Sequence, residues 1–418
     1  MKKGNNLSVV LVAIAFCALL LLSACGGGGG GDSSNSSISS IGDTTTPTVT
    51  GSGAFEGFGS SVTGGTGGTI VTVTNLNNSG SGSLRDALNG SNRIVQFAVA
   101  GTINLSSAIT VSGKNVTIDG FSAPSPGITL TSASDTLILS GNSSGPDATG
   151  SNIIVRGLRF RNSAGDGIQI AYNAHDIVVD HNSLSASGDG EVDITEGAYN
   201  VTVSYNILSK NNGPGPSLLT TAASKVSYHH NIYYGGMDRN PILTATHSRY
   251  YSSGPDYTGV LADVRYNVIW NYGIGTYLLS SGGVVSQGNV VSNLYKNNGS
   301  TNPSDVIIRS TYDSTARADA YIAGNVTVHD PRGCAYSYNS SPCYNFSSTN
   351  SQNNHAEFMV PAITGPSVTD QQGRLNEWLT VKNGAGVISK YADDANDLEV
   401  RTAIVVPSIS IFSAAWND

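Results

Sequence analysis

The chain has 418 residues, of which only 12% are charged, and its 21 basic and 29 acidic residues give a net charge of −8. This balance excludes a general nucleic-acid-binding surface, which needs a basic stripe. It does not exclude an acidic sugar polymer, because a bound divalent cation can reverse the local field. The 50 glycines, together with many asparagines and serines, are typical of tight turns between short strands.

Residues 1–24 are typical of a signal peptide. Lys2 and Lys3 precede a short apolar run, Leu7 to Leu22, which ends in small residues before Cys25. The run is too short for a usual membrane span. A cysteine at this position resembles a bacterial lipobox, in which the cysteine is acylated and anchors the protein to a membrane. We therefore expect a cell-envelope lipoprotein, in the outer membrane, or a secreted protein. An ordinary cleaved signal with an unmodified cysteine is the alternative.

Residues 25–67 are rich in Gly, Ser and Thr and contain few large apolar residues. Such a segment cannot bury enough surface to fold, so we expect a flexible linker. The remaining chain, about 350 residues, exceeds the usual size of a single core, but a solenoid grows by adding coils and escapes that limit. We expect one long domain at residues 68–345 and a C-terminal segment, residues 346–418, that packs on it.

Short apolar and β-branched runs after the linker predict strands. These runs are Thr69–Thr74, Arg93–Val99, Val116–Ile118, Ile128–Thr131 and Leu137–Leu139. After the first run, Ser83 and Asp86 form a start typical of a capped helix over Leu84–Asn89, which Gly90 stops. This short helix would close the first coil of a solenoid, whose apolar face and edge would otherwise be exposed.

A pattern of β-branched residues followed by asparagine recurs in the middle of the chain. It places Asn182, Asn206 and Asn231 at intervals of 24 and 25 residues. A period of this length corresponds to one coil of a solenoid, so the sequence predicts an all-β fold, a parallel β-helix. We expect these asparagines and Asn267 to form a ladder of amide hydrogen bonds between coils, and not a functional site.

An aromatic residue or a histidine precedes each of these asparagines: His181, Tyr205, His230 and Tyr266. The repeat predicts that these side chains form a second stack, which points away from the asparagines. His229 and His230 are candidates for a general base, but their place in the repeat favours stacking. We therefore leave both histidines out of catalysis.

Three aspartates recur at the spacing of the coils. Asp166 and Asp189 are 23 residues apart, and Asp193 follows four residues after Asp189. Side chains four apart on a strand point the same way, so we expect all three carboxylates to converge on the exposed outer face. An all-oxygen cluster suits a hard cation, and the sequence predicts a Ca²⁺ site. Arg239, 50 residues beyond Asp189, would face the same groove from two coils further on.

Other candidates are less clearly placed by the repeat. Arg159 and Arg161 alternate on a strand just before Asp166, so they could hold sugar carboxylates in a bidentate manner, or form ordinary salt bridges. Cys334 and Cys343 are nine residues apart in a loop-like stretch of an exported protein, where a disulfide or two free thiols would fit.

The β pattern fades after about residue 345, where the sequence predicts two helices. These are Asn376–Val381 and Ala392–Ile404. The second is acidic at its start, as the helix dipole favours. We expect both to pack along the solenoid or to cover its far end, which gives a mainly β-helical chain with a partly helical C-terminal segment.

Four motifs together resemble the pectate lyase family, and the likeness covers roughly residues 68–330. They are the D-x-x-x-D of Asp189 to Asp193, the V-T-V-S-Y-N of Val201 to Asn206, the S-Y-H-H-N of Ser227 to Asn231 and the D-R-N-P of Asp238 to Pro241. The stretch from Val73 to Leu88 is also similar to bacterial members. The resemblance implies a right-handed, single-stranded parallel β-helix.

The resemblance also implies an activity: β-elimination of 4-linked galacturonan (pectate) to unsaturated oligogalacturonides by a monomer, with Ca²⁺ bridging enzyme and substrate carboxylates. Arg239 would remove the proton beside the sugar carboxylate, and an alkaline optimum would follow because a free arginine has a pKa above about 12. Family members carry a substrate-binding lysine, for which Lys210 is the candidate, and a second arginine where this chain has Thr244. A lyase for another uronate or for methylated pectin, and a non-catalytic surface-anchored glycan-binding β-helix, are the alternatives.

Overall fold

The computed structural model describes residues 55–210, 212–213, 215–219, 223–245, 259–280, 284–298, 317–327 and 356–408. The predicted signal peptide, Cys25, most of the predicted linker and the Cys334 and Cys343 pair lie outside these residues. Among the helices in the described part, none is long and apolar enough to cross a membrane.

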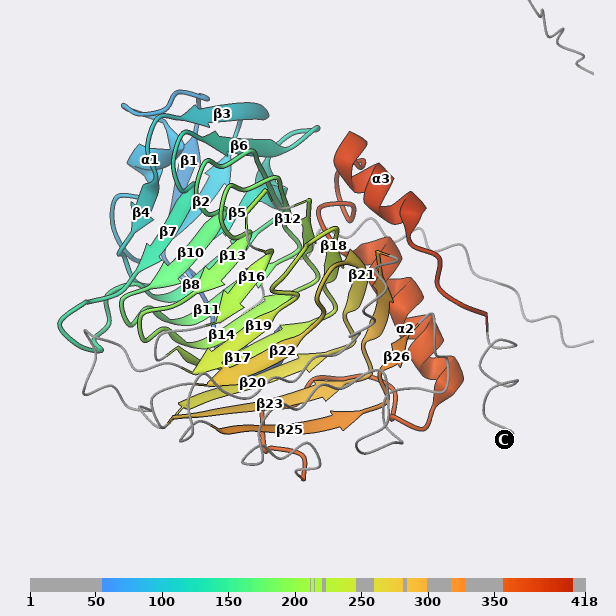
Figure 1. Cartoon of the computed structure of the whole chain (residues 1–418). Coiled ribbons are helices and arrows are strands. Elements are labelled where there is room, and N and C mark those ends of the chain that lie inside the picture. The colour runs from blue at the N-terminus through green and yellow to red at the C-terminus, as the bar shows by residue number, and fades with distance from the viewer. Residues whose placement is uncertain are drawn as a thin grey trace, which may run out of the picture. The chain divides into compact units, whose positions relative to one another are not determined.

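The described strands form three parallel sheets (Figure 1). Sheet A consists of β1 (Thr69–Val73), β2 (Arg93–Phe97), β5 (Val116–Asp119), β8 (Ser151–Arg156), β11 (His175–Asp180), β14 (Tyr199–Ser204), β17 (Ser224–His229), β20 (Gly259–Arg265), β23 (Val285–Val291) and β25 (Arg317–Ala323). Sheet B consists of β3 (Gly101–Leu105), β6 (Ile128–Ser132), β9 (Leu158–Arg161), β12 (Ser183–Ser185), β15 (Ile207–Ser209), β18 (Ile232–Tyr234), β21 (Val268–Tyr272), β24 (Leu294–Asn297) and β26 (Val326–Thr327). Sheet C consists of β4 (Ile109–Val111), β7 (Leu137–Ser140), β10 (Ile168–Ala171), β13 (Val192–Ile194), β16 (Ser217–Leu219), β19 (Ile242–Ala245) and β22 (Tyr277–Ser280).

Each coil in the middle of the stack contributes one strand to each sheet, and the pairing register repeats the sequence period. Ile177 of β11 lies between Ile153 of β8 and Val201 of β14, and all three side chains are fully buried. Burying one such side chain contributes about 1.5–3 kcal/mol, so columns of β-branched residues stabilise the stack along its length. The prediction of a right-handed parallel β-helix is confirmed.

The predicted asparagine ladder is confirmed at the turn between sheets A and B. The backbone N–H of Asn182 donates to Oδ1 of Asn206 at 2.8 Å, and the side-chain amide of Asn182 donates to the same atom at 3.2 Å. The same pairing repeats through the described coils as far as Asn325. The ladder therefore satisfies buried polar groups that would otherwise carry a desolvation cost.

The predicted aromatic stack lies beside the ladder. Ring centroids of His181, Tyr205, His230 and Tyr266 follow one another at 4.8, 4.7 and 5.2 Å. All four residues have a positive φ, between 52° and 58°. This left-handed conformation is uncommon for residues other than glycine, and here it recurs once per coil at the same turn.

The N-terminal end is closed as predicted by a short helix, α1 (Leu84–Ala87). Oγ of Ser83 accepts a hydrogen bond from the backbone N–H of Asp86 at 3.2 Å, which caps the helix. Leu84 and Ala87 are buried in the main core, so α1 covers the first coil with its apolar face.

The predicted linker is wrong at its C-terminal end, because residues 55–67 pack on sheet A. The backbone N–H of Phe58, in the 3₁₀ turn η1 (Gly57–Gly59), donates to Oγ of Ser227 at 3.1 Å, and Gly59 donates to Oγ1 of Thr202 at 2.8 Å. A side chain at Gly59 would lie 2.9 Å from Val178. The small residues that indicated disorder instead allow this close approach of backbone to sheet.

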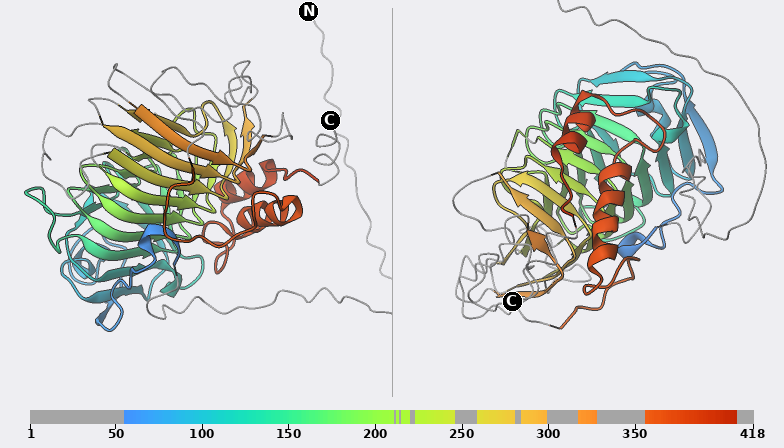
Figure 2. Two further views of the ribbon diagram at one scale, coloured as in Figure 1. Left: turned by 90° about the horizontal axis from the view of Figure 1, so that it is seen from below. Right: turned by 90° about the vertical axis from the view of Figure 1, so that its right-hand side faces the viewer.

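The C-terminal segment contains the two predicted helices, α2 (Gln371–Gly384) and α3 (Ala395–Ala403), which lie across the strands (Figure 2). Trp378 of α2 and Val400 of α3 pack with Ile207 and Ile232 on the outer side of sheet B. A second short 3₁₀ turn, η2 (Gly120–Ser122), follows β5. The helices therefore cover sheet B, and sheet C lies on a different side of the β-helix.

Candidate active site

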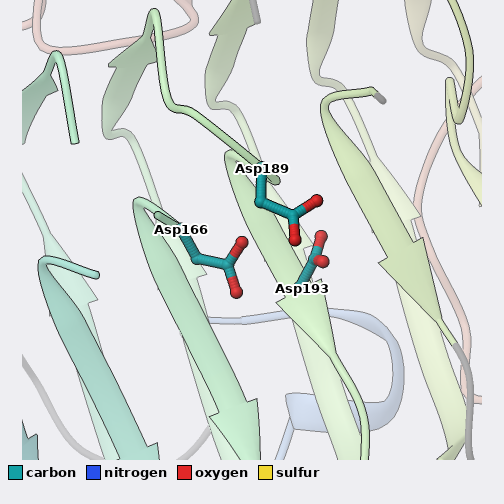
Figure 3. A group of neighbouring side chains, drawn as sticks. All are labelled: Asp166, Asp189 and Asp193. Atoms are coloured by element: carbon teal, nitrogen blue, oxygen red, sulfur yellow. The ribbon is translucent and has the colours of Figure 1, made fainter. Parts of the chain in front are cut away.

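Three aspartates converge at the start of two strands of sheet C. One carboxylate oxygen from each of Asp166, Asp189 and Asp193 lies within 4.8 Å of the other two (Figure 3). Strands β10 and β13 pair so that Gln169 lies beside Asp193. Asp189 therefore reaches the cluster from the turn before β13, and not from the strand itself. We call these three residues the acidic cluster.

The expectation that these aspartates are exposed holds only for Asp189. The side chain of Asp189 is 57% exposed, whereas Asp166 and Asp193 are each 5% exposed. The burial of Asp193 has a local cause, since a Cβ atom at Gly190 would lie 2.0 Å from its Oδ1 atom. Glycine at that position gives the carboxylate the space that it occupies.

The electrostatic state of Asp166 reflects its burial first and the neighbouring negative charges second. Burial raises the pKa of Asp166 to about 6, and the charges of Asp189 and Asp135 add to this effect. A 2.8 Å hydrogen bond from the backbone N–H of Gly190 opposes it. A carboxylate with such a pKa is a candidate functional group, because its environment disfavours the charged form that it needs to bind a cation.

Glu191 was missed by the sequence reasoning, although it supports the acidic cluster. Its side chain is fully buried, and its two oxygens accept hydrogen bonds from Ser187, one from the backbone N–H at 3.0 Å and one from Oγ at 2.6 Å. Burial raises the pKa of Glu191 to about 7. Strand alternation would place residue 191 on the same face as 189 and 193, but its carboxylate instead closes the turn that carries Asp189.

Arg239 faces the acidic cluster, as the coil spacing predicted. Its Nη1 atom lies 3.6 Å from Oδ1 of Asp189, and its side chain is 24% exposed. Its φ is 55°, and its backbone N–H donates to Oδ1 of Asp238 at 2.7 Å. A Cβ atom at Gly215 would lie 2.6 Å from Cβ of Arg239, so only glycine at position 215 leaves enough space for the arginine side chain. The contact with Asp189 is the salt bridge that a purely structural role would also produce.

Arg159 and Arg161 are not placed to bind substrate, which corrects the prediction for both. They lie on β9 of sheet B, and Nη2 of Arg161 contacts Asp394 at 2.8 Å and Asp397 at 3.1 Å. Arg159 is 4% exposed and lies 3.7 and 3.8 Å from the same two aspartates. Both guanidinium groups therefore hold the C-terminal segment against sheet B. We call these four residues the arginine–aspartate network.

Lys210 pairs with the C-terminal segment rather than with the acidic cluster, which goes against its predicted role as a substrate-binding residue. Its Nζ atom forms an ion pair with Glu399 of α3 at 2.5 Å. Thr244, where the family resemblance would place a second arginine, lies in β19 and is 7% exposed. Of the predicted site residues, the structure brings together the acidic cluster and Arg239.

Comparisons with known proteins find similar sequences and a shared fold. A family model described as the right-handed β-helix region matches residues 101–255. The probable pectate lyase C of Aspergillus terreus is 34% identical over 249 residues, which are 59% of this chain and 54% of that protein. The probable pectate lyase C of Emericella nidulans is 39% identical over 189 residues, which are 44% of this chain and 43% of that protein. The chain thus spans about half the length of these relatives.

Solved structures share the fold. The pectate lyase from Bacillus sp. N165, in complex with trigalacturonate, has 18% identity and a TM-score of 0.51, and the match covers 80% of this chain and 99% of that one. The thermostable pectate lyase PL 47 has 16% identity and a TM-score of 0.54, over 81% of this chain and 98% of that one. Over part of its length the chain is therefore similar to proteins named as probable pectate lyases, and it shares the β-helical fold of these solved structures.

Proposed function

We propose that the chain is a calcium-dependent pectate lyase, which acts on 4-linked galacturonan by β-elimination and releases unsaturated oligogalacturonides. The observation that carries this proposal is the position of Arg239, 3.6 Å from a cluster of three aspartates on sheet C. The relatives named as probable pectate lyases and the Bacillus structure with bound trigalacturonate support an acidic polysaccharide as the substrate.

The residues of the acidic cluster fit a calcium ion. Asp166, Asp189 and Asp193 offer only oxygen atoms, within 4.8 Å of one another, and hard cations prefer such ligands. Burial, together with the charges of Asp189 and Asp135, raises the pKa of Asp166, so positive charge placed beside these carboxylates would favour their ionised form. A bound calcium ion would supply that charge and would acidify the proton beside a coordinated sugar carboxylate.

Arg239 is the proposed base. In β-elimination the base removes the proton beside the uronate carboxylate, a carbon–carbon double bond forms, and the bond to the leaving sugar oxygen breaks. A guanidinium gives up its proton only in strongly alkaline solution, so the neutral form is scarce and turnover should increase toward alkaline pH. The hydrogen bond to Asp238 and the space left by Gly215 fix the backbone from which Arg239 reaches the site.

The experiment that tests this function follows the absorbance of unsaturated product during incubation with polygalacturonate, with calcium or with a chelator. We expect product only with calcium, and a loss of product in Asp189→Ala. Product formed from methylated pectin without calcium would favour the related lyase. Binding of polygalacturonate without product would favour a glycan-binding β-helix, a reading that the absence of a second arginine at Thr244 also favours.

We also propose that the chain is an envelope lipoprotein anchored through Cys25. The support is the sequence of residues 1–25 alone, with its basic start, short apolar run and terminal cysteine. A single acyl chain binds membranes only marginally, so stable anchoring needs more than one. Wild-type protein should partition with membranes and Cys25→Ser should not. Recovery of wild type entirely in the soluble fraction of its host would reject the anchor.

A further inference from the structure

A hollow of about 570 Å³ lies at the N-terminal end of sheet C, between β4 and the segment that contains α1. Its lining carries hydrogen-bonding side chains, including those of Arg85, Asn89, Ser91, Thr110 and Ser112. Hydroxyl, amide and guanidinium groups around a concave surface are the groups that can bind a sugar. The proposed reaction makes no use of this hollow.

The hollow lies in line with the acidic cluster. Thr110 of β4 pairs with Ile138 of β7, Ile138 pairs with Gln169 of β10, and Gln169 pairs with Asp193 of β13. Side chains at paired positions of neighbouring strands point to the same side of a sheet. Three strand spacings separate Thr110 from Asp193, or about 14 Å. A polymer bound at the acidic cluster can therefore reach the hollow along one face of sheet C.

Positive charge lies at the rim of the hollow. The lining itself contains one cation, Arg85, and one carboxylate, Asp86. Two further cations lie beside lining residues, because the guanidinium of Arg93 lies next to Gly90 and Lys114 directly follows Gly113. This is the opposite balance from the whole chain, whose net charge is −8. Arg85 donates to the carbonyls of two residues that precede β4, at 2.6 and 2.7 Å, which fixes its charge beside the hollow. Lys114 is exposed.

We propose that the hollow is a remote binding site for the acidic polysaccharide, which holds a part of the polymer that extends from the acidic cluster past β10 and β7. The identity of the polymer as a polyuronate rests on the proposed function. Arg85 and Lys114 face its carboxylates, and the hydroxyl and amide groups face its sugar hydroxyls. The site raises affinity only for chains long enough to reach it.

The test uses the full-length chain with Arg239→Ala, so that turnover does not consume the ligand. In this background Thr110→Trp fills the hollow from an exposed strand position, where an aromatic residue is well tolerated. Thr102→Trp is its matched control, because Thr102 is an exposed threonine on β3 of sheet B. Lys114→Glu removes positive charge from the rim, and Lys382→Glu on α2 controls for charge alone.

Calorimetric titration with polygalacturonate and with digalacturonate in the presence of calcium gives the readout. We expect Thr110→Trp and Lys114→Glu each to weaken polymer binding on the order of tenfold, as the loss of one or two hydrogen bonds or charge contacts would. Binding of digalacturonate, which is too short to span both sites, should not change, and neither control should affect either ligand.

Equal polymer affinity in Thr110→Trp and its parent would overturn the remote site, as would a parent that does not bind the polymer. An equal loss for polymer and digalacturonate would also overturn it, since the hollow would then not act through chain length. Product formation by the chain with Arg239 intact is measured separately. A failure of the proposed lyase activity is therefore distinguishable from a failure of the remote site.

Discussion

The acidic cluster and the arginine–aspartate network both gather carboxylates, but they match them with cations differently. In the network, Arg159 and Arg161 lie within 2.8–3.8 Å of Asp394 and Asp397, so two cations face two anions. In the acidic cluster three carboxylates converge within 4.8 Å, and Arg239 contacts one of them at 3.6 Å. Among these residues, the network has as many arginines as aspartates, and the acidic cluster has three aspartates and one arginine.

The two regions differ in their ratio of arginines to aspartates and not in the pKa direction of every carboxyl, because burial also raises the pKa of Asp397 in the network. Burial raises the pKa of Asp394, but Arg161 and the backbone N–H of Asp397 outweigh burial, and the net effect lowers the pKa. Burial and like charge instead raise the pKa of Asp166 to about 6. In the network the arginines offset the charge of the buried aspartates, so removing one partner would be costly. In the acidic cluster a bound cation would offset the repulsion among three carboxylates.

The largest expected effect comes from removing one acid of the arginine–aspartate network. Asp397 is fully buried, and Asp397→Ala leaves Arg159 and Arg161 with a single carboxylate. Breaking a buried ion pair in this way costs about 3–5 kcal/mol of the free energy of unfolding. Urea unfolding measures this loss. Asp189→Ala, at an exposed position, is the control and should change stability by less than about 1 kcal/mol. Equal losses in both variants would remove the contrast between the regions.

The next largest effect is expected at Arg239. Arg239→Lys keeps the positive charge but loses the planar guanidinium and its reach. If Arg239 removes the proton, kcat should fall on the order of a hundredfold or more, which is at least about 2.7 kcal/mol in the activation free energy. The rate of unsaturated uronide formation is measured across alkaline pH, with equal folding verified by circular dichroism. A lysine variant that keeps most of its turnover would leave Arg239 with the role of charge neutralisation.

The raised pKa of Asp166 predicts a pH dependence of calcium binding. Calcium needs the ionised carboxylate, so its affinity should fall as pH decreases through about 6, by up to about tenfold per pH unit. Because the folded-state pKa is raised, ionised Asp166 destabilises the metal-free fold above about pH 6, and this cost disappears below the unfolded-state pKa of about 3.9. Asp166→Asn should therefore stabilise the metal-free protein at neutral pH. Calorimetric titration with calcium at several pH values tests the predicted fall in affinity. A calcium affinity that stays constant between neutral pH and pH 5 would refute it.

The smallest expected effect concerns the buried support of Asp189. Glu191→Gln keeps the shape of the side chain but replaces one of the two oxygens that accept hydrogen bonds from Ser187. The loss of one hydrogen bond is worth about 1 kcal/mol, so calcium affinity should weaken about fivefold. Ser187→Ala removes the same hydroxyl contact from the other side and should give a similar result. Calcium affinity equal to that of wild type in both variants would separate Glu191 from the site.

The period of the sequence was sufficient to predict the fold and the acidic cluster. One coil of 24 or 25 residues fixes which residues stack, and it located the ladder from Asn182 onward and the approach of Arg239 to Asp189. Local signals were sufficient for α1, where Ser83 caps the helix as expected. These features depend on contacts within one or two coils, which sequence spacing describes directly.

The errors involve partners that are distant in the chain or backbone detail in turns. Arg161 pairs with residues more than 230 positions later, so no spacing rule indicated that its charge was already matched. Lys210 pairs with α3 for the same reason. The burial of Asp193 depends on the missing side chain of Gly190, and the packing of residues 55–67 depends on Gly59. Amino-acid composition alone does not predict that Gly190 lies against Asp193 or that Gly59 lies against sheet A.

The measurement that tests the central claim most directly is the rate of unsaturated uronide formation from polygalacturonate as a function of free calcium, for wild type and Asp193→Asn. Wild type should be inactive with a chelator and should be activated by calcium. Asp193→Asn keeps an oxygen ligand but loses a charge, so its activation curve should shift to calcium concentrations at least about tenfold higher. Activity of wild type with a chelator, or identical curves for the two proteins, would contradict the assignment of the acidic cluster as the calcium site of a lyase.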